Sequence, residues 1–207
     1  MSATLFFKRF LQRPKQVAYI VPSSPMLINR VMKKMDFSKP RTIVEFGPGE
    51  GCHTREIIKR MHPDSKVLLF EIDAEFTELL RKQFRHDPRV HILHTDAARL
   101  PQELAKLGID HCDYVVSGIP FSYIDKDKKQ EILQNIYESL APQPHSAFIV
   151  YQVTNELINH ATQFTRVESK YCLQNIPPMV VIKFHKMPLN GHSASTRVVN
   201  GNGHHHH

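Results

Sequence analysis

The pattern of hydrophobic and polar positions switches repeatedly along the chain between one typical of buried strands and one typical of helices. Short apolar, β-branched runs are followed by longer segments in which apolar residues recur at helical spacing, as in residues 74–86. This alternation predicts an α/β fold with a mostly parallel sheet and helices on both faces. The predicted strands are residues 42–46, 66–73, 90–95, 114–117 and 147–153, and the predicted helices are residues 26–35, 53–62, 74–86, 101–107, 125–140 and 155–164.

Two extended runs, residues 166–174 and 179–186, close the pattern. The few residues between them are too short for a crossover, so we expect an antiparallel hairpin. From Pro188 the chain is polar and rich in Gly, Asn and Ser, which is typical of a flexible tail, and it ends in a tag-like histidine run. The expected organisation is therefore an N-terminal helical segment (1–40), a sheet domain (41–187) and a tail (188–207).

The N-terminal segment combines an apolar face with basic charge. On a helix over residues 5–13, three Phe and Leu11 share one face and the Lys and Arg side chains share the other, until Pro14 ends the helix. The first 35 residues hold seven Lys and Arg and no Asp or Glu, whereas the rest holds 20 of each sign. This pattern is typical of a helix lying on an anionic membrane, although a helix docked on the domain or a nucleic-acid-binding arm shares parts of it. The predicted membrane contacts are Phe6, Phe7, Lys8, Arg9, Phe10 and Arg13.

Composition narrows the classes of protein. The 207 residues, 41% of them hydrophobic, suffice for one globular domain, and no apolar run is long enough to span a bilayer. Cys52, Cys112 and Cys172 show no CxxC spacing, so we expect neither a disulfide framework nor a metal site, and a reducing cytoplasm fits.

A glycine-rich loop follows the first predicted strand. Glu45 lies in that strand, and Gly47, Gly49 and Gly51 follow before a predicted helix. Glycines there allow a tight turn and close approach to a ligand, although a GxG pattern alone is weak evidence.

Acidic residues mark the ends of the next two predicted strands. Glu71 lies 22 residues beyond Gly49, where an acid can accept ribose hydroxyls, and Asp96 ends the third strand before Ala97. Because the carboxyl ends of parallel strands share one edge, these acids predict a ligand site there. For any single acid, an N-cap of a helix is the alternative.

The segments EFGPGEG, FEID, TDA and SGIPF resemble, in order and spacing, the class I S-adenosylmethionine-dependent methyltransferases over residues 42–187. The resemblance implies a Rossmann-like, seven-stranded, mostly parallel sheet with an antiparallel C-terminal hairpin strand. It also implies S-adenosylmethionine as cofactor and S-adenosylhomocysteine as product. The implied cofactor contacts are Glu45, Gly47, Gly49 and Gly51 at the methionine end, Glu71 and Ile72 at the ribose, Asp96 and Ala97 at the adenine, and Ser117.

Two branches of these enzymes share such a glycine loop. In the ribosomal RNA adenine dimethyltransferases the fourth strand ends in Asn-Leu-Pro-Tyr or Asn-Leu-Pro-Phe, and the Asn side chain holds the adenine amine. The corresponding residues here are Gly118-Ile-Pro-Phe121, so the amide is missing.

The second branch, the bacterial phospholipid N-methyltransferases, resembles more of the chain, namely residues 10–35, 117–120 and 175–178. It implies methylation of phosphatidylethanolamine toward phosphatidylcholine by a peripheral protein on the cytoplasmic face of a bacterial membrane. We expect a monomer with no nucleic-acid partner. The alternatives are an enzyme for another aminolipid such as ornithine lipid, an RNA adenine methyltransferase, and a non-enzymatic membrane-binding protein.

The resemblance also suggests acceptor-site residues. Backbone groups of Ser117, Gly118 and Ile119 would orient the amine, Phe121 or Tyr123 would face the growing cation, and His53 is either a base or an ordinary loop histidine. The candidates for lipid phosphate are Lys15, Tyr19, Ser24, Arg166 and Lys170, with Tyr19 also counted among the catalytic candidates.

Overall fold

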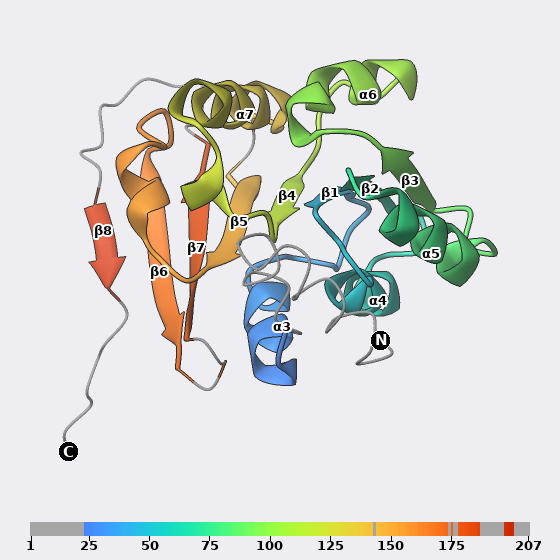
Figure 1. The fold of residues 1–207 in the computed structure, drawn as a ribbon, viewed down its shortest axis with the longest axis horizontal. Coiled ribbons are helices and arrows are strands. Elements are labelled where there is room, and N and C mark those ends of the chain that lie inside the picture. Colours follow the sequence, from blue (N-terminus) through green and yellow to red (C-terminus); the bar gives the residue numbers. More distant parts are fainter. Residues whose placement is uncertain (1–22, 143, 174, 176–177, 187–196, 201–207) are drawn as a thin grey trace.

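The computed structural model describes residues 23–142, 144–173, 175, 178–186 and 197–200, which build one mixed sheet of order β3-β2-β1-β4-β5-β7-β6-β8 (Figure 1). The first five strands are mutually parallel, and β7 runs antiparallel to both β5 and β6. The predicted sheet with its antiparallel C-terminal hairpin is therefore confirmed. The strands are β1 (Thr42–Phe46), β2 (Lys66–Glu71), β3 (Val90–His94), β4 (Tyr114–Ser117), β5 (Ala147–Gln152), β6 (Arg166–Cys172), β7 (Met179–His185) and β8 (Arg197–Asn200).

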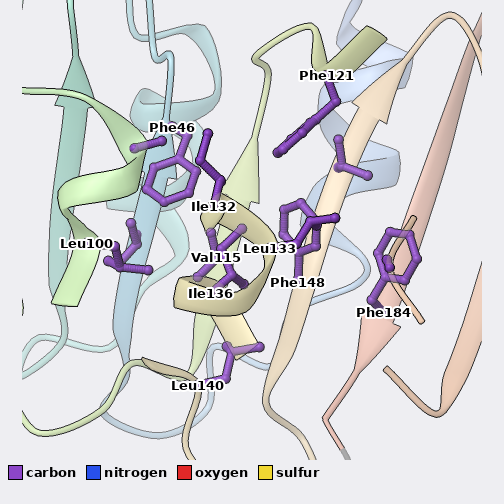
Figure 2. Close-up of a cluster of buried hydrophobic side chains, with 14 of the residues drawn as sticks. Phe46, Leu100, Val115, Phe121, Ile132, Leu133, Ile136, Leu140, Phe148 and Phe184 are labelled. Carbon is purple, nitrogen blue, oxygen red and sulfur yellow. The ribbon is translucent and has the colours of Figure 1, made fainter. Parts of the chain in front are cut away.

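Helices cover both faces of the sheet (Figure 1). Alternate strand residues are buried on opposite sides: Val44 and Phe46 join the cluster under α6 and α7, which Figure 2 shows in part, and Ile43 joins the cluster under α3, α4 and α5. Burial on both faces explains why the strands are almost continuously apolar. The helices are α3 (Pro25–Met32), α4 (Cys52–Arg60), α5 (Ala74–Phe84), α6 (Leu100–Lys106) and α7 (Lys126–Ser139).

Two elements differ from the prediction. The helix predicted over residues 155–164 is wrong, because only Glu156–Asn159 forms a 3-10 turn. Leu157, Ala161 and Phe164 are all buried, and the chain buries them with a short turn and a loop in place of a helix. The added strand β8 pairs in parallel with β6 and lies in the segment that we expected to be a flexible tail.

The register brings the carboxyl ends of the parallel strands to one edge. Phe46 pairs with both Phe70 and Ser117. The turn between β6 and β7 lies at the same edge, because Val180 at the start of β7 pairs with Gln152 at the end of β5. The start of α3 is joined to this turn, since the backbone N–H of Ser24 donates to Asn175 Oδ1 at 3.1 Å.

The predicted helix over residues 5–13, with its membrane contacts Phe6, Phe7, Lys8, Arg9, Phe10 and Arg13, lies outside the described residues, as do Lys15 and Tyr19. Within the part of the chain that the structure describes, no helix is long and apolar enough to cross a membrane.

Candidate active site

The glycine loop after β1 is built on left-handed backbone. Gly47, Gly49 and Gly51 have φ of 65°, 54° and 76°, a region that disfavours side chains. A Cβ on Gly47 would lie 2.9 Å from Ile119 Cγ2, and one on Gly51 would lie 3.0 Å from the Phe84 ring. A Cβ on Gly49 would meet nothing within 4 Å, so the loop is packed at both ends and open in the middle. This open backbone precedes the N-terminus of α4, as expected for a ligand cradle.

Glu71, the predicted ribose acid, braces this loop. Its two oxygens accept hydrogen bonds from the backbone N–H groups of Gly49 at 3.1 Å and Asp73 at 2.9 Å. Burial raises the pKa of Glu71. A carboxylate oxygen accepts more than one hydrogen bond, so these contacts leave capacity for ribose hydroxyls. The next side chain, Ile72, is 72% exposed and offers an apolar surface beside that acid.

Glu45 supplies a buried carboxylate with one unused oxygen. Its Oε2 accepts from Thr54 Oγ1 at 2.6 Å, whereas Oε1 is buried and has no hydrogen-bond partner among the described residues. Burial raises the pKa of Glu45 to about 7. A buried acceptor without a partner is rare in folded proteins. The ammonium group at the methionine end of S-adenosylmethionine would supply that partner, so the residues present fit the cofactor.

Asp96 acts as a cap in this structure. Its Oδ1 accepts from the Ala98 N–H at 2.7 Å and lies 3.5 Å from Lys128 Nζ. The N-cap alternative that the sequence left open therefore applies to Asp96. Its side chain remains 50% exposed at the sheet edge next to the buried Ala97, so the adenine contact of both residues remains a prediction.

The end of β4 is shaped by a tyrosine that sequence analysis did not select. Ser117 is buried and its Oγ accepts from the Ile119 N–H at 3.3 Å. A Cβ on Gly118 would lie 2.8 Å from Tyr151 Cζ and even closer to the hydroxyl oxygen. The register accounts for this contact, because Ser117 pairs with Val150 at the end of β4 and continuing the same register by one residue sets Gly118 beside Tyr151.

His53 lies in the first turn of α4 and stacks on the Tyr151 ring, with centroids 4.3 Å apart and planes at 19°. The side chain is buried, and burial lowers the pKa of His53 to about 3. His53 Nε2 has no hydrogen-bond partner within the described residues. The residue is therefore neither a satisfied loop histidine nor a good proton acceptor near pH 7.

Two predicted acceptor residues do not belong to the site. Phe121 is 1% exposed and packs edge-on against Phe148 in the core under α7, so it cannot face a cationic acceptor (Figure 2). Arg166 pairs with His185, which in turn pairs with Ala147 at the start of β5, so its backbone lies at the opposite edge of the sheet.

Ser24 and Lys170 both lie toward the acceptor side, but the Ser24 hydroxyl is already used in a helix cap, whereas Lys170 is exposed. The Ser24 hydroxyl caps α3 by accepting from the Leu27 N–H at 3.2 Å, and Lys170 is exposed near the end of β6. Exposed apolar side chains follow three strands at the same edge: Tyr123 after β4, Val153 after β5 and Leu173 after β6. Within the described residues no group of His, Cys, Asp and Glu could hold a metal ion.

Comparison with known proteins agrees with this geometry. The profile of the ribosomal RNA adenine dimethylase family matches residues 22–182. Over 138 residues the chain is 33% identical to the ornithine lipid N-methyltransferase of Singulisphaera acidiphila, which covers 67% of this chain and 72% of that protein. It is also 33% identical over 112 residues to the ribosomal RNA small subunit methyltransferase A of Mycoplasma capricolum, which covers 52% of this chain and only 39% of that protein.

Solved structures agree in fold. The N-methyltransferase NodS of Bradyrhizobium japonicum WM9 superposes with a TM-score of 0.67 at 12% identity, over 81% of this chain and 98% of that one. The same protein in complex with S-adenosylhomocysteine gives a TM-score of 0.66 at 11% identity. The family match and the glycine loop with its acids confirm the predicted cofactor. The chain therefore belongs to the ribosomal RNA adenine dimethylase family of class I S-adenosylmethionine-dependent methyltransferases.

Proposed function

We propose that the protein methylates the head-group amine of a membrane aminolipid, either ornithine lipid or phosphatidylethanolamine and its methylated derivatives. The observation that carries this proposal is the contact between Gly118 and Tyr151. An RNA adenine dimethyltransferase presents an Asn side chain at the position of Gly118, and here the Tyr151 phenol fills that space. The similarity to an ornithine lipid N-methyltransferase over 72% of that protein supports an aminolipid as acceptor.

Cofactor binding and acceptor binding would use different parts of the sheet edge: the cofactor half at the ends of β1, β2 and β3, and the acceptor half at the ends of β4 and β5 and the turn after β6. Glu45 would hold the cofactor's ammonium group and Glu71 would hold its ribose. The backbone at Gly49, which is open to a ligand, would lie against the cofactor between these two contacts. When bound, S-adenosylmethionine supplies an electrophilic methyl group, whose transfer forms an N–C bond, breaks the S–C bond with the electron pair left on sulfur, and releases one amine proton. The carbonyl groups of Ser117 to Ile119 would orient the amine. An alkylamine in water is mostly protonated near pH 7, and a partly buried site favours its neutral form.

Access to such a substrate requires docking on a lipid surface. The exposed Tyr123, Val153 and Leu173 surround the edge that carries the site, and the N-terminal segment enters the fold at Ser24 on that same edge. Apolar side chains insert into the interface, and the basic residues of the first 35 positions favour anionic lipid. In this proposal the protein is peripheral on the inner face of a bacterial cytoplasmic membrane.

Methyl transfer to defined vesicles tests the proposal. Purified protein and labelled S-adenosylmethionine are incubated with anionic vesicles that contain ornithine lipid, phosphatidylethanolamine or neither, and the lipids are separated and weighed by mass spectrometry. Label in one aminolipid, with added methyl mass on its head group, is the expected result and identifies the substrate. Equal binding to anionic and purely zwitterionic vesicles in a flotation assay would contradict the docking part of the proposal.

A further inference from the structure

We propose that the Tyr151 hydroxyl contacts the acceptor amine and, with Gly118, makes the site selective for an aliphatic amine. The inference rests on the proposed function for the identity of the acceptor, and it assigns a role to a residue that no motif selected. Tyr151 lies in β5, one residue before that strand ends, and its hydroxyl occupies the space where a Cβ on Gly118, the residue after β4, would lie.

The first argument is steric. Gly118 does not have a positive φ, so its backbone conformation would accept any residue. The requirement for glycine at this position therefore comes from the lack of space beside it. A Cβ would overlap the Tyr151 phenol, with Cζ only 2.8 Å away. Glycine at position 118 and tyrosine at position 151 are therefore a matched pair, in which the phenol takes the place of a side chain on Gly118.

The second argument concerns the surroundings of the phenol. Its ring stacks on His53, which burial keeps neutral, so no cation beside the ring opposes a cationic acceptor. Burial and the neighbouring Glu45 carboxylate raise the pKa of Tyr151 well above its ordinary value. The phenol thus stays protonated, and its oxygen keeps lone pairs that accept a hydrogen bond from an amine N–H.

The third argument is the polarity of the cluster. Glu45 Oε1 and His53 Nε2 are both buried without a hydrogen-bond partner in the described part of the chain, and both residues neighbour Tyr151. In this account the cofactor's ammonium group takes Glu45 Oε1, which leaves His53 Nε2 and the Tyr151 hydroxyl as neutral polar groups on the acceptor side. Their lone pairs suit the N–H groups of an aliphatic amine, and neither residue offers the amide that would hold an adenine amine.

The test compares two cofactor analogues and therefore needs no lipid. Sinefungin carries a primary amine where the transferable methyl group sits, whereas S-adenosylhomocysteine has no group there. Isothermal titration of both ligands to the full chain gives the ratio of sinefungin affinity to S-adenosylhomocysteine affinity. We expect Tyr151→Phe to lower sinefungin affinity, and therefore this ratio, about tenfold, with S-adenosylhomocysteine affinity unchanged. Tyr137→Phe is the matched control, because Tyr137 packs on Phe164 on the other face of the sheet.

A lipid assay separates this inference from the proposed function. We expect Tyr151→Phe to lower the turnover of the aminolipid about tenfold at unchanged cofactor affinity. An unchanged sinefungin ratio would overturn the role of the hydroxyl, whatever the lipid result. A reduced ratio in a protein that methylates no aminolipid would support the amine contact and contradict the proposed function.

Discussion

The cofactor half and the acceptor half of the sheet edge are built in different ways. In the cofactor half, which comprises the glycine loop and the ends of β1, β2 and β3, Glu71 ties the loop to the end of β2 through one hydrogen bond from the Gly49 N–H, and its second bond, from the Asp73 N–H, fixes the carboxylate; both partners lie within 22 residues along the chain. In the acceptor half, contacts join distant segments: Gly118 with Tyr151, and Ser24 with Asn175. The cofactor half is thus a local frame that methyltransferases can share, whereas the acceptor half depends on which side chains the strand register brings together.

The largest loss of function should come from a substitution at Glu71, which holds the glycine loop of the cofactor half. Glu71→Ala removes the acceptor for the N–H groups of Gly49 and Asp73 and the predicted ribose contact, so S-adenosylhomocysteine affinity should fall about 100-fold. Isothermal titration measures it. Glu78→Ala is the control, because that side chain is exposed on α5 and its ion pair with Arg81, at 3.9 Å, lies at the surface. Equal affinity of the two variants would contradict the bracing role.

Overpacking should break the acceptor half while sparing the frame. Gly118→Asn forces the new side chain into the Tyr151 phenol and should lower the free energy of unfolding by about 3 kcal/mol. Tyr151→Ala in the same chain frees that space, so the double variant should recover part of the loss. Chemical denaturation of the four proteins gives the coupling energy. Additive effects would show that the two residues do not share this space.

The pH dependence of cofactor binding should report Glu45. Its pKa is raised from 4.5 to about 7 by burial, so its charge is absent below that pH and present above it. Pairing with an ammonium group needs the charged form, and affinity should therefore rise about tenfold between pH 6 and pH 8. For the cofactor-free fold the sign is opposite, since stability from this group is lost as pH rises from 4.5 through 7.

Glu45→Gln sharpens this result, because the amide keeps an acceptor for Thr54 and cannot titrate. Its affinity for S-adenosylhomocysteine should be lower than that of the wild type at pH 8 and nearly independent of pH. A wild-type slope that persists in Glu45→Gln would assign the titration to another group.

The smallest effect should come from the link between α3 and the turn after β6. Asn175→Ala removes the acceptor of the Ser24 N–H and should destabilise the fold by about 1 kcal/mol, with cofactor affinity unchanged. Thermal unfolding compares it with Asn159→Ala, an exposed asparagine of the 3-10 turn. A loss of cofactor affinity in Asn175→Ala would show that the two halves are coupled.

The same contrast explains what the sequence could predict. The sequence predicts Glu45, Gly49 and Glu71 as cofactor contacts because glycines and acids at strand ends follow a short local pattern, and the apolar runs predict the strands themselves. Tyr151 was missed because its partner is 33 residues away and only the register of β4 and β5 places it. Phe121 was assigned wrongly because a 3-10 turn after Pro120 directs it into the core. The prediction for Arg166 is wrong because the turn of the β6–β7 hairpin lies at the site edge. Arg166 begins β6 and therefore lies at the opposite edge.

The most direct measurement is a competition between the two acceptor classes in one tube. The wild-type protein is given labelled S-adenosylmethionine, anionic vesicles with ornithine lipid and phosphatidylethanolamine, and unmethylated ribosomal RNA, and initial rates are counted in the separated lipid and RNA. The account predicts that label enters aminolipid and that RNA stays at background. Label in RNA at the expense of lipid would contradict it and would mean that an adenine amine is held without an amide at position 118.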